Sequence, residues 1–227
     1  MEIINTENIN EKTIFENSLL NSLPSLNGLW FPEKINKLPD IFFNTIETLS
    51  FNEIAFTVLK NITDYKLSDE KLKKVIKKAF NFPVKLKELD KKIHILETFH
   101  GPTYTFKDFG ARFLACYLEE YLSNSNEKYN VLVSTSGDTG SAIASAFHNI
   151  PNIEVTILYP KNRISKIQEL QMTTYGDNIT AYCIENNFDQ CQSMVKKAFL
   201  DKNIKVKLIS ANSILIPLDC LKKCHGT

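Results

Sequence analysis

The sequence predicts an α/β protein with an open, mostly parallel sheet and helices on both faces, preceded by a small, mainly helical N-terminal region. After Lys91, short apolar runs alternate with amphipathic stretches, which is typical of buried strands joined by helices. The connections between these segments are short enough for compact crossovers. Residues 51–82, in contrast, carry apolar side chains at helical spacing.

Residues 1–50 are rich in Asn, Ser, Thr and Pro, and Pro residues break them into short pieces. Helices are expected at 51–62 and 68–82, with Ser68 as the N-cap of the second. Five later strands are expected, at Ile93–Phe99, Val131–Ser134, Val155–Tyr159, Ile179–Ile184 and Val206–Ile209. Four helices are expected between them, at Phe106–Leu122, Ser141–His148, Ile164–Tyr175 and Phe188–Leu200.

Composition excludes several classes of protein. The 227 residues include 27 Lys and Arg against 26 Asp and Glu, and a net charge of +1 gives no field that would attract nucleic acid. No run approaches the roughly 18 apolar residues of a membrane helix, and the N-terminus lacks a signal-peptide pattern, so we expect a cytoplasmic protein without a membrane partner. Five cysteines predict reduced thiols. The spacing of Cys220, Cys224 and His225 lacks a second ligand pair, and no metal is expected.

Glycine usage points to a site. Only seven glycines occur, about 3% where roughly 7% is usual, yet Gly101, Gly110, Gly137 and Gly140 fall in one short stretch. Glycine is used where φ is positive or where the backbone must approach another group closely. Residues 100–140 are therefore the first place to look for a ligand.

The first candidate loop is HGPTYTFKDFGARF, residues 100–113. Thr105 and Asp108 have capping-box spacing, which predicts Lys107 in the first turn of the next helix. A helix N-terminus and the flanking Phe106 and Phe109 disfavour the charged form of a lysine. An uncharged lysine forms a Schiff base with an aldehyde such as that of pyridoxal phosphate. The alternative is a surface lysine whose stem covers aromatic rings.

The second candidate loop is STSGDTGS, residues 134–141, between an expected strand and helix. Gly137 and Gly140 allow a tight turn, and hydroxyl groups join backbone N–H groups at a helix start, which is typical of an anion cradle. The loop fits neither the dinucleotide fingerprint nor the Gly-Lys-Ser/Thr phosphate loop. Asp138 opposes an anionic ligand unless its carboxylate points away or pairs with a cation. A purely structural turn is the alternative.

Five segments, in order, resemble the threonine synthases, pyridoxal-phosphate enzymes of the tryptophan-synthase-β class. They are NGLWFPEKINKL, FHGPTYTFKDFGARF, STSGDTGSA, YPKNRISKIQELQMTTYGDNITAYCIENNFDQCQ and ISANSI. The resemblance implies the fold-type II architecture of these enzymes, pyridoxal 5'-phosphate as cofactor and a carbon–oxygen lyase activity. The implied reaction converts O-phospho-L-homoserine and water into L-threonine and phosphate.

The same resemblance assigns roles to residues. It implies that Lys107 is catalytic and that it contacts the cofactor together with Phe106 and Asp108. It implies substrate binding by Thr103, Ser136, Gly137, Asp138, Thr139, Lys161, Arg163, Ser165 and Gln168.

The resemblance ends after Ile214, where the family continues with a long segment that carries the cofactor-phosphate loop. We expect a truncated or frame-shifted form that is weakly active or inactive, with regions at 1–90 (N-terminal), 91–214 (catalytic, incomplete) and 215–227 (divergent tail). Two alternatives stay open: another lyase of the class, such as a serine/threonine dehydratase, and a non-catalytic, anion-binding α/β domain. Monomer and homodimer are both compatible with the sequence.

Overall fold

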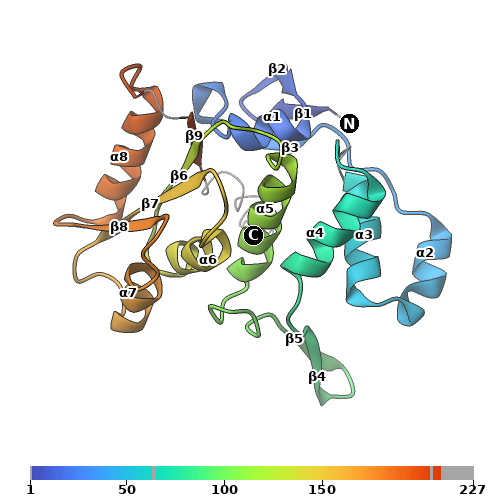
Figure 1. Ribbon diagram of the computed structural model, residues 1–227. Helices are drawn as coiled ribbons and strands as arrows, with labels where there is room; N and C mark the ends of the chain where they lie inside the picture. Colours follow the sequence, from blue (N-terminus) through green and yellow to red (C-terminus); the bar gives the residue numbers. More distant parts are fainter. Residues whose placement is uncertain (1, 63–64, 205–206, 211–227) are drawn as a thin grey trace. The chain divides into compact units, whose positions relative to one another are not determined.

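The computed structural model describes residues 2–62, 65–204 and 207–210 (Figure 1). The described residues form two compact units, the first made by residues up to 78 and the second by residues 79–210. The expected tail at 215–227, with Cys220, Cys224 and His225, lies outside the described residues. No helix in the described part of the chain is long and apolar enough to cross a lipid bilayer.

The first unit combines a small antiparallel sheet with helices. Its strands β1 (Ile3–Asn5), β2 (Asn8–Thr13) and β3 (Trp30–Pro32) lie in the order β2-β1-β3. The α-helices are α1 (Phe15–Leu20), α2 (Asp40–Thr45), α3 (Phe51–Ile62) and α4 (Asp69–Ala79), and 3₁₀ turns lie at Ser25–Asn27 and Ile46–Thr48. Ser68 caps α4 as expected, because its hydroxyl accepts the N–H of Lys71 at 3.3 Å. The three-stranded sheet is an addition that the composition of residues 1–50 did not indicate.

The second unit is built on a parallel sheet with the strand order β8-β7-β6-β9. Its strands are β6 (Tyr129–Ser134), β7 (Ile153–Pro160), β8 (Ile179–Ile184) and β9 (Lys207–Ser210). The helices between and before them are α5 (Lys107–Tyr121), α6 (Asp138–Phe147), α7 (Lys166–Thr173) and α8 (Phe188–Leu200). The predicted α/β architecture is confirmed. Val206, expected to start the last strand, lies outside the described residues.

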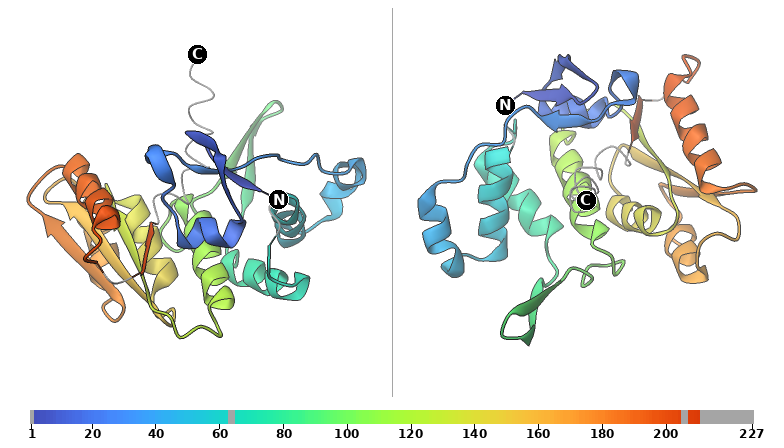
Figure 2. Two further views of the ribbon diagram at one scale, coloured as in Figure 1. Left: turned by 90° about the horizontal axis from the view of Figure 1, so that it is seen from above. Right: turned by 180° about the vertical axis from the view of Figure 1, so that it is seen from behind.

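Alternation along the strands explains the layers. Leu132 and Leu158 pack with Cys191 and Val195 of α8 on one face of the sheet. Their strand neighbours point to the opposite face, where α6 packs against β7 and also against α5 and α7. Figures 1 and 2 show α8 and α6 on opposite sides of the strands. Both faces of the sheet are therefore covered, as the apolar strand sequences predict.

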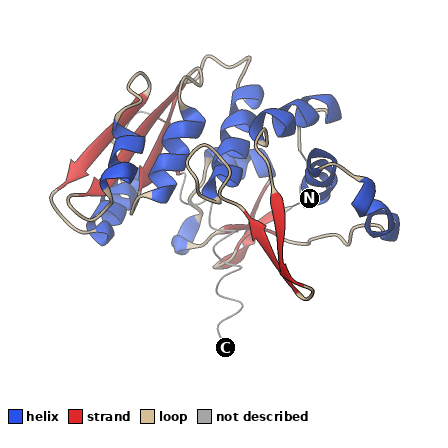
Figure 3. Ribbon diagram, turned by 90° about the horizontal axis from the view of Figure 1, so that it is seen from below, coloured by secondary structure: helices blue, strands red, loops and turns tan. Residues whose placement is uncertain are grey.

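The expectation for Ile93–Phe99 is wrong in one respect. This run forms β5 (Ile93–Glu97), which pairs antiparallel with β4 (Lys85–Asp90) in a separate hairpin and is not part of the parallel sheet (Figure 3). Its side chains are largely exposed, including Leu96. The charged strand β4 favours this pairing, because the register places Lys85 opposite Glu97 and Glu88 opposite His94.

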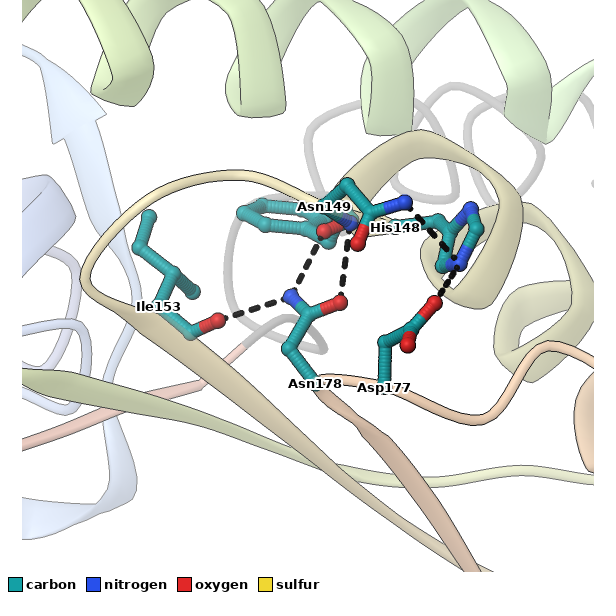
Figure 4. Close-up of polar contacts among 6 residues, drawn as sticks. His148, Asn149, Ile153, Asp177 and Asn178 are labelled. Atoms are coloured by element: carbon teal, nitrogen blue, oxygen red, sulfur yellow. Dashed lines mark hydrogen bonds and ion pairs between the residues drawn. The ribbon is translucent and has the colours of Figure 1, made fainter.

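A group of side-chain hydrogen bonds lies at the amino-terminal edge of the sheet (Figure 4). The Asn178 amide donates to the carbonyls of Phe147 and Ile153 at 2.9 and 2.8 Å, and its oxygen accepts the N–H of Asn149 at 2.8 Å. His148 lies 2.9 Å from Asp177. These contacts connect the turn between α6 and β7 to the residues just before β8, and three of them are hydrogen bonds between backbone groups and the Asn178 side chain.

Candidate active site

The loops that follow β6 and β7 lie at the same, carboxyl-terminal edge of the parallel sheet. β6 lies between β7, which the chain reaches through α6, and β9, which it reaches through α8 on the other face. The chain thus runs from β6 outward to β7 and β8 and then crosses back to β9 on the other side of β6. Ligands of open α/β sheets bind where the strand order reverses in this way. The segments that follow Ser134 and Pro160 lie at this edge because parallel strands end on the same side.

The loop before α5 is folded onto the first turn of that helix. Asp108 is completely buried, and its carboxylate accepts the N–H of Thr103 at 2.9 Å and the Thr103 hydroxyl at 2.7 Å. A Cβ at Gly101 would lie 2.4 Å from Asp108 Oδ2, so only glycine allows this approach. The Asp108–Thr103 clasp fixes the residues immediately around Lys107.

The capping box expected from Thr105 and Asp108 does not form. The Asp108 N–H donates to the Thr105 carbonyl at 3.2 Å, while the Asp108 carboxylate is used by Thr103. The reason is the tight turn at Tyr104, whose φ is +60°, because it folds Thr103 back toward the helix. The Thr105 hydroxyl oxygen is left buried without a hydrogen-bond partner.

Lys107 lies in the first turn of α5, as expected, and is half-buried; the helix begins at Lys107, one residue later than the expected start at Phe106. Its Nζ lies 4.5 Å from the centroid of the Phe106 ring, a contact that attracts an ammonium group. Phe109, expected to flank the lysine, instead lies against Phe80 and Phe82, with ring centroids 5.9 and 4.9 Å away. Residues two apart on a helix point in different directions, which explains the difference.

The loop after β6 is organised by Thr135. This residue is 1% exposed, and its hydroxyl oxygen accepts the N–H groups of Gly137 and Gly140, both at 2.9 Å. The first turn of a helix leaves its N–H groups without partners inside the helix. Because Thr135 takes two of them, the N–H groups of Asp138 and Thr139 are the ones that this turn offers to an anion.

Gly137 and Asp138 are held from the side by α7. Ser165 caps this helix in a reciprocal capping box with Gln168: the Ser165 hydroxyl accepts the Gln168 N–H at 3.2 Å, and Gln168 Oε1 accepts the Ser165 N–H at 3.0 Å. Gln168 Nε2 also donates to Asp138 Oδ1 at 2.8 Å. The structure thus brings together Gly137, Asp138, Ser165 and Gln168, all of which were predicted as site residues.

The other predicted residues at this edge are solvent-facing. Ser136 is exposed beside the buried Gly137. Lys161 and Arg163 lie exposed on the connection from β7 to α7, and Lys161 forms an ion pair with Glu185. An exposed pair of this kind contributes little to stability, so Lys161 can exchange partners at low cost.

Sequence reasoning missed three features of this site. Thr135 was counted as one loop hydroxyl among several, although it is the acceptor that shapes the turn. The Ser165–Gln168 capping box was also missed, and here the Ser-x-x-Gln spacing was a readable signal. The Asp138–Gln168 contact joins residues 30 positions apart, and no local pattern predicts it.

The residues present fit the expected pyridoxal phosphate. A cofactor held through its aldehyde needs a lysine on a fixed backbone, which the Asp108–Thr103 clasp provides for Lys107. The buried, unpartnered hydroxyl of Thr105 lies two residues before that lysine and offers a polar group to a ligand.

The comparisons with known proteins agree with this geometry. The family described as "Pyridoxal-phosphate dependent enzyme" matches residues 79–213, and "Threonine synthase N terminus" matches residues 3–80. Curated threonine synthases from Buchnera aphidicola subsp. Acyrthosiphon pisum (strain APS) and Escherichia coli (strain K12) are 42% and 37% identical, over 99% of this chain and 53% of each relative. The chain spans about half the length of the curated relatives it matches.

Solved structures give the same result. The crystal structure of threonine synthase from Escherichia coli matches with a TM-score of 0.87 and 36% identity, covering 95% of this chain and 50% of that one. The structure of pyridoxal-phosphate-bound threonine synthase from Brucella melitensis matches with a TM-score of 0.85 and 32% identity, covering 94% and 48%. The chain is thus similar to threonine synthases along nearly its whole length, and the family match over more than half of its residues shows that it belongs to the pyridoxal-phosphate-dependent enzymes.

Proposed function

We propose that this chain carries the catalytic lysine of a threonine synthase, Lys107, and its substrate loop, the segment after β6 at residues 135–141. A threonine synthase converts O-phospho-L-homoserine and water into L-threonine and phosphate. In this reaction the carbon–oxygen bond to phosphate breaks, and water adds its oxygen at Cβ. The observation that carries the proposal is the position of Lys107, held at the first residue of α5 by the wholly buried Asp108.

Lys107 has two roles in this proposal. Its amine holds the cofactor through the aldehyde, and after substrate has taken its place the amine moves protons at Cα and Cβ. Pyridoxal phosphate, when bound, supplies the electron sink for the negative charge that develops on the substrate. Phe106 keeps the Nζ group over its ring until a partner arrives. Asp108 and Thr103 act by fixing the backbone on which Lys107 stands.

The loop after β6 binds the amino-acid end of the substrate in this scheme. The N–H groups of Asp138 and Thr139 and the hydroxyl groups of Ser136 and Thr139 donate to the carboxylate. Gly137 permits the turn that points them outward. Binding the carboxylate there fixes which bond at Cα is labile.

The substrate phosphate is assigned to the connection between β7 and α7. Lys161 and Arg163 are exposed cations at the same sheet edge, and Ser165 opens the following helix. A dianion attracts both cations and draws Lys161 from its exposed partner Glu185. Cys116, Cys183 and Cys191, the cysteines in the described part of the chain, form no disulfide with one another, which supports a place in the reducing cytoplasm.

Labelling tests the proposal directly. The 227-residue chain is incubated with pyridoxal phosphate and reduced with borohydride, and mass spectrometry locates the adduct. We expect it on Lys107, and we expect its loss in Lys107→Ala. Lys196→Ala, which removes an exposed lysine on α8, is the matched control and keeps the adduct. Scattered labelling that Lys107→Ala leaves unchanged would contradict the assignment.

Product analysis tests the reaction. Chain loaded with pyridoxal phosphate and not treated with borohydride is incubated with O-phospho-L-homoserine, and threonine, phosphate and 2-oxobutanoate are measured separately. Threonine and phosphate in equal amounts support the proposal, since each turnover releases one of each. Formation of 2-oxobutanoate and ammonia together with phosphate instead identifies another lyase of the class.

A further inference from the structure

Gln168 occupies both ends of its amide in contacts that join two elements. Its oxygen closes the capping box of α7 with Ser165, and its nitrogen donates to the Asp138 carboxylate in the first turn of α6. The side chain also lies against Gly137, where a Cβ would come within 2.4 Å of Gln168 Cδ. The α7 cap and the substrate loop are therefore one hydrogen-bonded assembly.

This assembly solves an electrostatic problem in the loop. Asp138 is exposed at the very turn whose N–H groups would receive a carboxylate, and a second negative charge there repels the ligand. The Gln168 amide takes Asp138 Oδ1 and directs it toward α7. The carboxylate is thereby held by a neutral donor on the side of the loop where α7 begins.

We propose that Gln168 is a positioning residue, not a substrate ligand: it orients the Asp138 carboxylate toward α7 and fixes the loop in the conformation that accepts the amino-acid carboxylate. This inference deepens the proposed function and rests on it for the identity of the ligand. The mechanical part, that Gln168 holds the loop through Asp138, depends only on the contacts described above.

A charge swap tests the inference. Gln168→Glu keeps an oxygen for the Ser165 N–H, and Glu is as good as Gln at this position of a capping box, but it places two carboxylates face to face. The double variant Asp138→Asn/Gln168→Glu restores one donor and one acceptor with the roles exchanged. The readout is amide hydrogen exchange of residues 135–141 and 165–171 in the chain without cofactor.

We expect residues 135–141 to exchange about tenfold faster in Gln168→Glu, the ratio for losing one charge-assisted hydrogen bond. The α7 peptide stays as protected as before, and the double variant restores the loop. The affinity for L-threonine is then measured in chain loaded with pyridoxal phosphate, from the change in cofactor absorbance. We expect a lower affinity in Gln168→Glu and a restored affinity in the double variant.

Two outcomes overturn the inference. Equal loop protection in all three proteins would show that the Asp138–Gln168 contact does not hold the loop. Loosening that the double variant fails to repair would show that the charge introduced at position 168 acts on the loop by a route other than the contact with position 138. Failure of the proposed function is a separate result, because an absent Lys107 adduct leaves the hydrogen-exchange comparison in cofactor-free chain unchanged.

Discussion

Replacing Gly137 by alanine tests whether the substrate loop depends on close packing against α7. Gly137 has φ +133° and ψ −81°, a conformation that residues with a Cβ rarely adopt. An added Cβ would also lie 2.4 Å from both Cδ and Nε2 of Gln168, where carbon atoms prefer separations of about 3.5–4.0 Å. Either the loop or Gln168 must move by about 1 Å.

The magnitude follows from these two effects. Backbone strain at a position of this kind costs about 1–3 kcal/mol. Displacing Gln168 breaks its hydrogen bonds to Ser165 and Asp138, each with a net value of about 1 kcal/mol. We therefore expect Gly137→Ala to lower the free energy of unfolding by about 3–5 kcal/mol, a large part of the roughly 5–15 kcal/mol typical of a domain.

Gly176→Ala is the matched control. Gly176 also has positive φ, +67°, but nothing lies within 4 Å of a Cβ built there. Only backbone strain of about 1–2 kcal/mol is expected. Urea unfolding followed by circular dichroism at equal protein concentration compares the two variants. Equal losses of unfolding free energy would refute the reasoning, because the collision with Gln168 would then have no energetic weight.

Three further predictions concern other parts of the second unit. Asp108→Asn places an amide beside the two donor groups of Thr103 that now donate hydrogen bonds to the Asp108 carboxylate. We expect urea unfolding to show a loss of unfolding free energy of about 2–3 kcal/mol, and less borohydride-trapped adduct on Lys107. An unchanged adduct yield would contradict the role given to the Asp108–Thr103 clasp. Asn178→Ala removes three hydrogen bonds to backbone groups (Figure 4); we expect a loss of about 2–4 kcal/mol with specific labelling retained in the folded variant, and a change in labelling site would contradict the separation of the two sheet edges. Burial, and next the hydrogen bond to Glu127, raise the pKa of Tyr129 to about 12 from an ordinary 10.0. The neutral phenol is therefore favoured in the folded chain, and its contribution to the free energy of unfolding is complete below pH 10 and lost between about pH 10 and 12. We expect the loss of unfolding free energy between these pH values to be smaller in Tyr129→Phe, as measured by urea unfolding.

Much of the second unit is predictable from local pattern. Val131–Ser134 and Val155–Tyr159 are apolar runs because both faces of their strands are covered by helices, and this is the signal that sequence periodicity carries. The run Ile93–Phe99 also carries several apolar side chains but pairs with a charged strand in an exposed hairpin. An apolar run predicts that a strand forms but not which strand it pairs with. The prediction for Ile93–Phe99 was therefore right about the strand and wrong about the sheet to which it belongs.

The candidate site divides in the same way. The place of Lys107 at a helix start follows from sequence, because a loop and a helical pattern meet there. The contacts that hold the site do not: Asp108 binds Thr103 where capping-box spacing predicts Thr105. Spacing rules assume a standard entry into the helix, and the positive φ of Tyr104 changes that entry.

The use of glycine explains why these loops were recognisable at all. Four other positions of the second unit with positive φ are occupied by asparagine or aspartate, Asn149, Asn152, Asn162 and Asp177, residues that tolerate this conformation. At Gly101, Gly137 and Gly140 an added Cβ would instead collide with a side chain that holds the site: Asp108, Gln168 and Thr135, respectively. In these loops glycine therefore marks close approach to the site's supporting side chains. A cluster of glycines in a glycine-poor chain pointed to the site for a steric reason, and the side chains that each glycine admits are the ones whose substitution should disturb it.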